Sequence, residues 1–344
     1  MPYATAAAVA NMDAVLTNIA SFISGLTGWT VVQAPTTATL APLSGGRDYI
    51  ARKGACLVGL RSTTTGPSGN ALFLYDGTGA WSSGPAHNLN GNSGLGVYTT
   101  TVSMAAGITI RGFQGVVGPF PNLFLFSNTA HDYVHVVLQI SSASYRHMAF
   151  GNLTQYGNWT DTSLGAYFSG TYWSQSDNGG GFPISVPGAN LHGAFFDNQH
   201  CLSGEQVDWT VSYDTGRGLG IKWISPSGHV VSFAGSGVGR TAGYASARGG
   251  FGSMPKRIPI SLFTGLIPMG PVVVLSVNFD TSPITGCVIG EIPDIRQINM
   301  TNLTGGQEFT IGSDTWKVFP MAAKNGAVHF DSSGVAGFAY KKIP

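Results

Sequence analysis

The chain has 344 residues, of which 49 are glycine and only 10% are charged, against about 7% glycine and about 25% charged residues in ordinary globular proteins. This composition excludes a coiled coil or long helical bundle, whose solvent faces need Glu, Lys and Arg, and it excludes charge-driven disorder. With 17 basic and 16 acidic residues there is no basic excess, so we expect no nucleic-acid partner.

The first predicted element is an amphipathic helix between Thr5 and Gly25, with Thr5 as a possible N-cap. Its apolar residues recur at three- and four-residue steps. The stripe must be covered, either by the β core of this chain or by a neighbouring copy. Three residues of the stripe are therefore candidate interface or structural residues: Leu16, Ile19 and Phe22.

After Trp29 the apolar period changes to two, which predicts short strands separated by Gly, Pro and Asn turns. The chain shows no strand–helix–strand alternation, which disfavours a parallel sheet. We therefore predict a mainly β fold with antiparallel β-sandwich or barrel-like subdomains and one N-terminal amphipathic helix. The predicted strands are Cys56–Arg61, Leu72–Tyr75, Ile108–Phe113, Leu123–Phe126, Val134–Ile140, Val207–Tyr213, Leu219–Trp223, His229–Phe233, Val272–Phe279, Cys287–Glu291, Glu308–Ile311 and Thr315–Phe319.

Polar, glycine-rich stretches indicate the domain boundaries. The stretch Gly235–Gly252 is typical of a long loop or linker, and we place a subdomain break near residue 255. The predicted segments are a helix and linker (1–30), a β subdomain (31–130), a β subdomain with aromatic and Gly-rich loops (131–254) and a C-terminal β subdomain (255–344).

Three widely spaced cysteines, Cys56, Cys201 and Cys287, fit neither a disulfide framework nor a zinc ribbon. We expect free thiols in a chain made in a reducing cytoplasm. The first residues lack the basic segment and unbroken apolar run of a signal peptide, and no apolar run is long enough for a membrane span.

The histidines are the first candidates for chemistry. His131 and His135 would face the same side of one strand, and a turn could bring His147 to them to complete a metal site. The alternative is that His135 and His147 are hydrogen-bonded residues within a β sheet. We favour the second interpretation and expect neither metal nor cofactor.

Signatures of catalysis are incomplete or absent. The stretch Gly235–Thr241 resembles a phosphate-binding loop but has Ala234 and Arg240 where the motif needs Gly and Lys, and no G-x-S-x-G segment occurs. We therefore expect no enzyme activity.

Aromatic residues near loop carboxylates between residues 159 and 197 could bind or cut sugars, or could form small cores beneath long loops. The candidate glycan-binding residues are Trp159, Tyr172 and Trp173.

Two stretches, Val134–Trp173 and Pro293–Tyr340, carry a recognisable pattern: a strand, an R-H-x-x-F-G-x-[LI] segment, an aromatic and glycine run, and a closing W-x-V-F-P strand. In these stretches the chain resembles structural proteins of tailed bacteriophages of the kind found among tail genes. The matching positions are Arg146, His147, Phe150, Gly151, Leu153, Trp316, Val318, Phe319 and Pro320.

This resemblance implies a virion protein of the tail or baseplate that works by symmetric assembly and is made in the cytoplasm of a bacterial host. Its partners would be copies of itself and other tail proteins. The resemblance carries no catalytic residues, and it makes Arg146, His147 and Trp316 candidate structural or interface residues. The scarcity of charge agrees with surface buried against other chains, although a neutral Ser/Thr/Asn-rich surface would also dissolve. The alternative function is a receptor- or glycan-binding module of the tail, with a host surface glycan as its partner.

Overall fold

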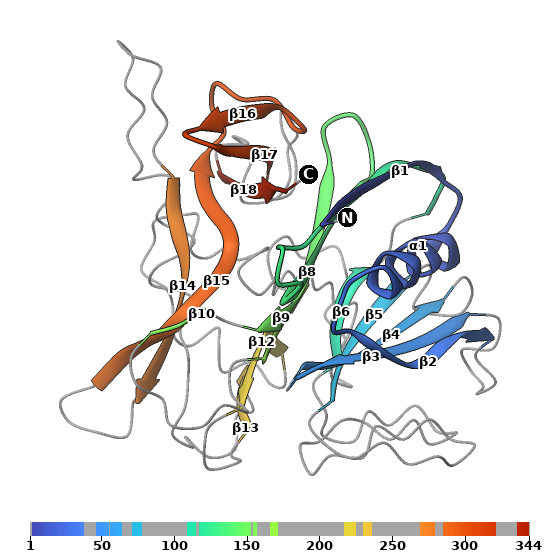
Figure 1. Cartoon of the computed structure of the whole chain (residues 1–344), viewed down its shortest axis with the longest axis horizontal. Coiled ribbons are helices and arrows are strands. Elements are labelled where there is room, and N and C mark those ends of the chain that lie inside the picture. The colour runs from blue at the N-terminus through green and yellow to red at the C-terminus, as the bar shows by residue number, and fades with distance from the viewer. Residues whose placement is uncertain are drawn as a thin grey trace.

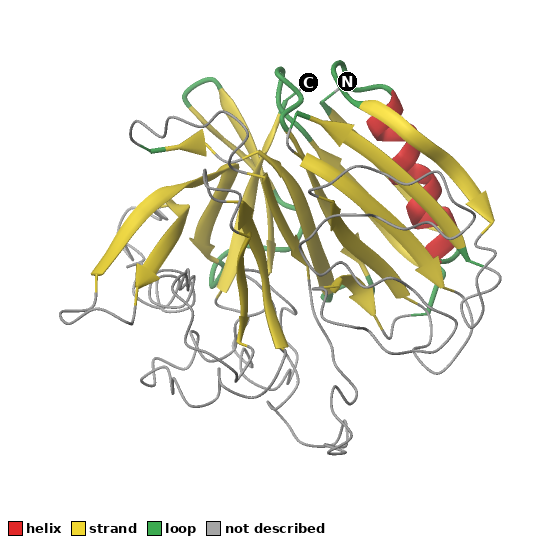
Figure 2. Cartoon of the chain, turned by 90° about the horizontal axis from the view of Figure 1, so that it is seen from below, coloured by secondary structure: helices red, strands yellow, loops and turns green. Residues whose placement is uncertain are grey.

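The fold is layered from antiparallel β-sheets and one helix (Figures 1 and 2). The computed structural model describes residues 2–37, 46–54, 56–63, 71–77, 109–114, 117–152, 154–156, 166–170, 217–224, 230–235, 269–278, 285–320 and 336–343. Every strand pairing in these ranges is antiparallel. The predicted mainly β class with a single N-terminal helix is therefore confirmed for this part of the chain.

The described elements are β1 (Tyr3–Val9), α1 (Met12–Ser24), β2 (Thr30–Thr37), β3 (Arg47–Lys53), β4 (Cys56–Thr63), β5 (Ala71–Gly77), β6 (Thr109–Gln114), β7 (Phe120–Phe126), β8 (Tyr133–Gln139), β9 (Tyr145–Asn152), β10 (Thr154–Gln155), β11 (Ala166–Gly170), β12 (Arg217–Ile224), β13 (Val230–Gly235), β14 (Met269–Asn278), β15 (Thr285–Asn299), β16 (Glu308–Ile311), β17 (Asp314–Pro320) and β18 (Ala336–Lys342).

Three larger sheets form the layers. The central sheet has the order β1-β7-β8-β9-β11, the N-terminal sheet runs β2 to β6 in chain order, and the C-terminal sheet has the order β10-β15-β18-β17-β16 with β14 on β15. In Figure 1 the central sheet lies between the N-terminal sheet with α1 and the C-terminal sheet. Strands β8 and β9 are consequently buried on both faces. Among the described residues no helix is long and apolar enough to cross a membrane.

The helix begins later than predicted. Residues Tyr3–Val9 form β1 and pair in register with β7, and α1 starts at Met12 with Asn11 as N-cap, whose side chain accepts a hydrogen bond from the Ala14 amide at 2.9 Å. The predicted start at Thr5 is therefore wrong. The alanines of this segment have high helix propensity, but pairing with β7 satisfies the backbone groups on that side of the strand and outweighs the local preference.

The apolar stripe of α1 packs on this chain's own core. Leu16 and Ile19 are fully buried in one hydrophobic cluster, to which β4, β7 and β8 each contribute residues. Phe22 is partly exposed and packs against that cluster. The helix contacts β2, β3 and β4 of the N-terminal sheet as well as β1 and β7 of the central sheet. Of the two coverings that the sequence left open, the structure contains the first, a β core of the same chain.

Most predicted strands are present with shifted ends, and β15 is much longer than predicted. The predicted strand Val207–Tyr213 and the break near residue 255 lie outside the described residues. The strands that the periodicity did not reveal are β1, β2, β3, β9, β10, β11 and β18. The alternation of apolar and polar residues that identifies a strand is weakest in β9, because both faces of this strand are buried.

Strand pairing crosses the predicted segment boundaries. β1 pairs with β7 across residue 30, β7 pairs with β8 across residue 130, and β10 pairs with β15 across residue 254. The segments thus share sheets, and the division into four subdomains stays a prediction.

A buried ion pair joins neighbouring strands of the N-terminal sheet on the face turned away from α1. Arg61 of β4 lies opposite Asp48 of β3, and its guanidinium donates to both carboxylate oxygens, with 2.5 Å between Nη2 and Oδ2. The next residue, Ser62, projects from the other face of the sheet and donates to Asp13 of the helix. Ser62 therefore ties the helix to the sheet, while the ion pair joins β3 to β4 at a place where water is excluded.

We expect Arg61→Met to destabilise the chain by about 3–5 kcal/mol, because it leaves the Asp48 carboxylate buried without its counter-charge. The double variant Arg61→Met/Asp48→Leu should recover most of this loss, since an apolar pair replaces the ion pair. Urea unfolding of the two variants and of Asp48→Leu measures the cycle. A single variant as stable as the parent would contradict a structural role for the pair.

Candidate functional site

The predicted histidines lead to an aromatic cluster between the central and C-terminal sheets. Side chains alternate along β8 and β9, so His135 and His147 project from the same face of the central sheet. The opposing face of the C-terminal sheet supplies Phe319, Phe338 and Tyr340. All five side chains are buried, and we call them, with Tyr133, the interlayer cluster.

His147 connects the two sheets through both ring nitrogens. Nδ1 lies 2.7 Å from the Tyr340 hydroxyl, Nε2 lies 2.9 Å from the Pro320 carbonyl oxygen, and the imidazole stacks on the Tyr340 ring with centroids 5.8 Å apart. Because a carbonyl oxygen only accepts, the Nε2–H tautomer donates to Pro320 and the Tyr340 hydroxyl donates to Nδ1. A neutral imidazole therefore satisfies every group in this arrangement.

Burial sets the protonation state of the cluster. It lowers the pKa of His147 to about 4, the Pro320 carbonyl opposing this shift and the Arg146 charge adding to it. Burial also lowers the pKa of His135 well below its usual 6.5 and raises that of Tyr340 well above 10. The cluster is thus neutral at pH 7, and its chemistry there is hydrogen bonding and packing.

His135 lies beside this contact and packs against an aromatic partner of its own. Its ring stacks on Tyr133 with centroids 4.0 Å apart. The Tyr133 hydroxyl donates to Asp294 Oδ2 at 2.8 Å, so β8 is joined to β15 of the C-terminal sheet by a second polar contact.

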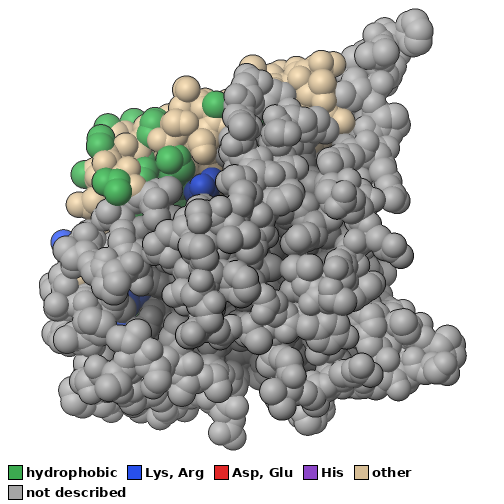
Figure 3. Space-filling view, turned by 180° about the vertical axis from the view of Figure 1, so that it is seen from behind, with side chains coloured by type: hydrophobic (Ala, Val, Ile, Leu, Met, Phe, Trp, Pro, Cys, Tyr) green, Lys and Arg blue, Asp and Glu red, His purple; other side chains and the backbone are tan. Residues whose placement is uncertain are grey.

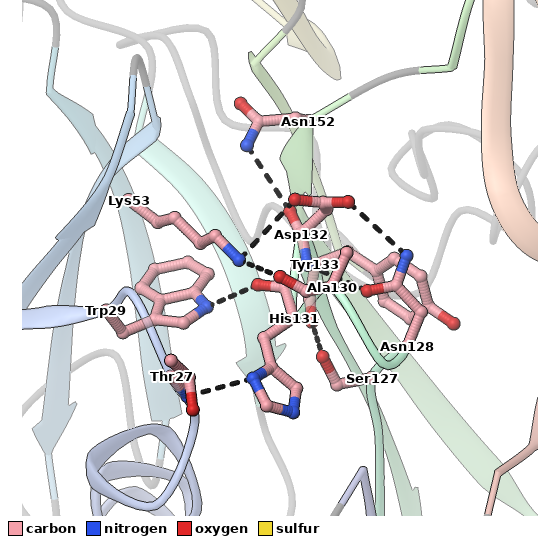
Figure 4. A network of polar contacts seen from close by, with 10 residues as sticks. All are labelled: Thr27, Trp29, Lys53, Ser127, Asn128, Ala130, His131, Asp132, Tyr133 and Asn152. Atoms are coloured by element: carbon pink, nitrogen blue, oxygen red, sulfur yellow. Dashed lines mark hydrogen bonds and ion pairs between the residues drawn. The ribbon is translucent and has the colours of Figure 1, made fainter.

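His131 lies in the turn between β7 and β8, not on a strand with His135 as its spacing had suggested. It has a positive φ of 58°, and its Nδ1 accepts from the Thr27 amide at 2.8 Å while its carbonyl accepts from Trp29 Nε1 at 2.7 Å (Figure 4). The Lys53 side chain reaches the same turn, where its Nζ lies 3.4 Å from Asp132 Oδ1. The turn therefore anchors the loop after α1 and the β3–β4 turn to the central sheet.

The three histidines accordingly do not form one ligand set. In the described part of the chain no three His, Cys, Asp or Glu side chains converge as metal ligands. That His135 and His147 belong to β strands is confirmed, and His147 has the predicted hydrogen bonds. The absence of a bound metal stays a prediction, and elemental analysis of the purified chain, with about one zinc or iron per chain as the contradicting result, tests it.

The other candidate residues have internal neighbours. Arg146 is half-buried on the opposite face of β9, and its Nη1 donates to the Tyr145 carbonyl at 3.1 Å. Trp316 is buried in the core of the C-terminal sheet with Val318 and Ala339, and the Arg296 guanidinium lies 5.7 Å from the centre of its ring. The described contacts of Trp316 are thus structural.

Several candidates cannot be placed in this way. Trp159, Tyr172, Trp173 and the Gly235–Thr241 loop lie largely or wholly outside the described residues. Of the cysteines, Cys56 is fully buried. Sequence reasoning missed Tyr133 and Tyr340 as partners of the histidines, because Tyr340 is far from His147 along the chain and no short motif joins them.

Comparison with known proteins does not assign the chain to a family: no protein-family model matches it, and no curated protein matches it.

Proposed function

We propose that this chain is a structural protein of a tailed-bacteriophage virion, a tail or baseplate component that catalyses nothing and works by symmetric assembly with copies of itself and other tail proteins. It would be made in the bacterial cytoplasm and reside in the virion. The observation that carries the proposal is the scarcity of charge on a β protein whose sheet edges expose apolar side chains.

Exposed apolar residues lie on strands at sheet edges. In β2, the outer strand of the N-terminal sheet, Val32 keeps 39% of its surface exposed, and in β16, at the end of the C-terminal sheet, Ile311 keeps 51%. The alanines Ala7 and Ala8 of β1, an outer strand of the central sheet, are exposed too. Figure 3 shows apolar side chains gathered on the side of the molecule where Figure 1 places β1 and α1.

The described parts of the two stretches that carry the resemblance to tail proteins pack against each other. His147 of the first stretch bonds to Pro320 and Tyr340 of the second. Gly151 lies against Tyr133 so closely that an added Cβ would meet the Tyr133 Cα at 2.5 Å. Of the motif residues, His147 and Pro320 therefore join the two sheets, and Gly151 fits β9 closely against β8, so their described contacts are structural.

Sedimentation velocity of the purified full chain tests assembly. We expect a closed symmetric oligomer at micromolar concentration, and Val32→Asp and Ile311→Asp should each weaken it, because a charge at an exposed apolar position of an edge strand opposes contact with another chain. Ser141→Asp, at an exposed turn position between β8 and β9, is the matched control. A monomer at all concentrations would contradict assembly of the chain with itself.

Virion localisation needs its own measurement. An antibody against the chain should label the tails of purified particles in electron micrographs. Label found only in the soluble fraction of infected cells would contradict the proposal, whatever the oligomeric state.

A glycan-binding role is the second candidate, and one exposed aromatic favours it. Tyr156 keeps 39% of its surface exposed, and its hydroxyl donates to Glu291 at 2.9 Å, beside Arg296. An open aromatic ring next to polar groups can stack on a sugar. Binding to immobilised bacterial surface glycans that Tyr156→Ala abolishes and Tyr156→Phe retains would support this role, and no binding by the parent chain would contradict it.

A further inference from the structure

We propose that the interlayer cluster makes the docking of the C-terminal sheet on the central sheet acid-sensitive, so that mild acid separates the two layers while each sheet persists. This inference goes beyond the assembly proposed above and does not depend on it.

The cluster buries two imidazoles without a carboxylate among its own side chains. A proton on His147 Nδ1 would remove the acceptor of the Tyr340 hydroxyl, which would have to turn its hydrogen away and accept from Nδ1 instead. His135, on the same sheet face, is buried against Tyr133 and lies 5.9 Å, centroid to centroid, from the Tyr340 ring. Both imidazoles thus sit where a positive charge would be separated from water.

The charged groups around the cluster come from each neighbouring element. Arg146 lies next to His147 on β9, and Lys317 of β17 and Lys342 of β18 both bind Glu308 of β16. On β15, Asp294 accepts from Tyr133, whose ring stacks on His135. Among the described residues, Tyr340 of β18 and Tyr145 of β9 are the other titratable neighbours, and burial raises the pKa of each of these phenols. Both phenols therefore stay neutral in acid.

Separation of the layers would expose the imidazoles of His135 and His147 to water. The pKa of His147 is about 4 when docked and returns towards 6.5 when exposed, so the separated state binds more protons in the window between about pH 4 and pH 6.5. Docking is therefore undisturbed above this window, weakens as the pH falls and reaches its full penalty below about 4. The backbone hydrogen bonds within each sheet contain no titrating group and do not share this penalty.

Near-UV and far-UV circular dichroism of the full chain between pH 7.5 and pH 3.5 tests the proposal. We expect the near-UV signal of the aromatic cluster to be lost within this range while the far-UV β signal persists, and the same loss should appear as an increased radius of gyration in X-ray scattering. His147→Gln, which still offers a donor to Pro320, and His135→Phe, which retains a stacked ring, should each move the near-UV midpoint to lower pH by about half a unit or more. His131→Gln, in the β7–β8 turn, is the matched control and should not move it.

Three results would overturn the inference. They are a near-UV signal unchanged down to pH 3.5, near-UV and far-UV signals lost together, and a midpoint that is the same in the parent, His147→Gln and His135→Phe. Either His variant can decide the last point if the other does not fold.

Discussion

Replacing Leu16 by aspartate is expected to destabilise the chain by roughly 4 kcal/mol or more, a large fraction of the stability of an ordinary domain, which is about 5–15 kcal/mol. Leu16 is fully buried in a hydrophobic cluster between the N-terminal and central sheets. The substitution removes the packing of an apolar side chain and also puts a carboxylate where water is excluded. Urea unfolding followed by circular dichroism measures the loss.

Ser21→Asp is the matched control for this prediction, because Ser21 lies on the exposed face of α1. We expect it to cost less than about 1 kcal/mol. The point substitution is sharper than deletion of residues 1–28, which would also remove β1 and its pairing with β7. Equal stability of Leu16→Asp and Ser21→Asp would show that the helix does not cover the core.

Gly151→Ala should destabilise the chain by about 3 kcal/mol or more, since two costs add. The residue has φ of +151°, which side-chain-bearing residues rarely adopt, and an ideal Cβ would lie 2.5 Å from Tyr133 Cα and 2.6 Å from the Asp132 carbonyl oxygen. These are backbone atoms of β8 and of the turn before it, so they cannot rotate away. The Asn152 amide, which donates to that carbonyl at 2.9 Å, would also be displaced.

The control for backbone conformation alone is Gly312→Ala. Gly312 also has a positive φ, of 60°, but an added Cβ would meet no atom within 4 Å. Its substitution should lower the free energy of unfolding by only about 1–2 kcal/mol, which is the energy needed to hold an alanine in the left-handed backbone conformation. Thermal unfolding of both variants separates the two contributions, and similar losses would mean that the approach of β9 to β8 is not the constraint.

Whether a strand could be predicted from the sequence depended on whether one of its faces is exposed to water. Strands β16 and β17 have Gly312 and Ser313 between them and were predicted nearly to the residue, because a turn signal separates two β-prone runs. β9, with the segment RHMAF, has no alternation because a layer covers each of its faces. β1 was mistaken for helix because its alanines carry no face preference.

The candidate site also has features that the sequence predicts and features that depend on tertiary contacts. Composition and spacing alone determined the mainly β class, the apolar stripe of α1, and the preference for His135 and His147 as members of a sheet. Only the tertiary structure decided that Tyr340 and Pro320 bind His147. It also decided that His131 lies in the β7–β8 turn, where it contacts the loop after α1. The reason is that periodicity reports local geometry and exposure, whereas contacts between residues 147 and 340 arise when separate sheets stack, and no local pattern encodes which faces will meet.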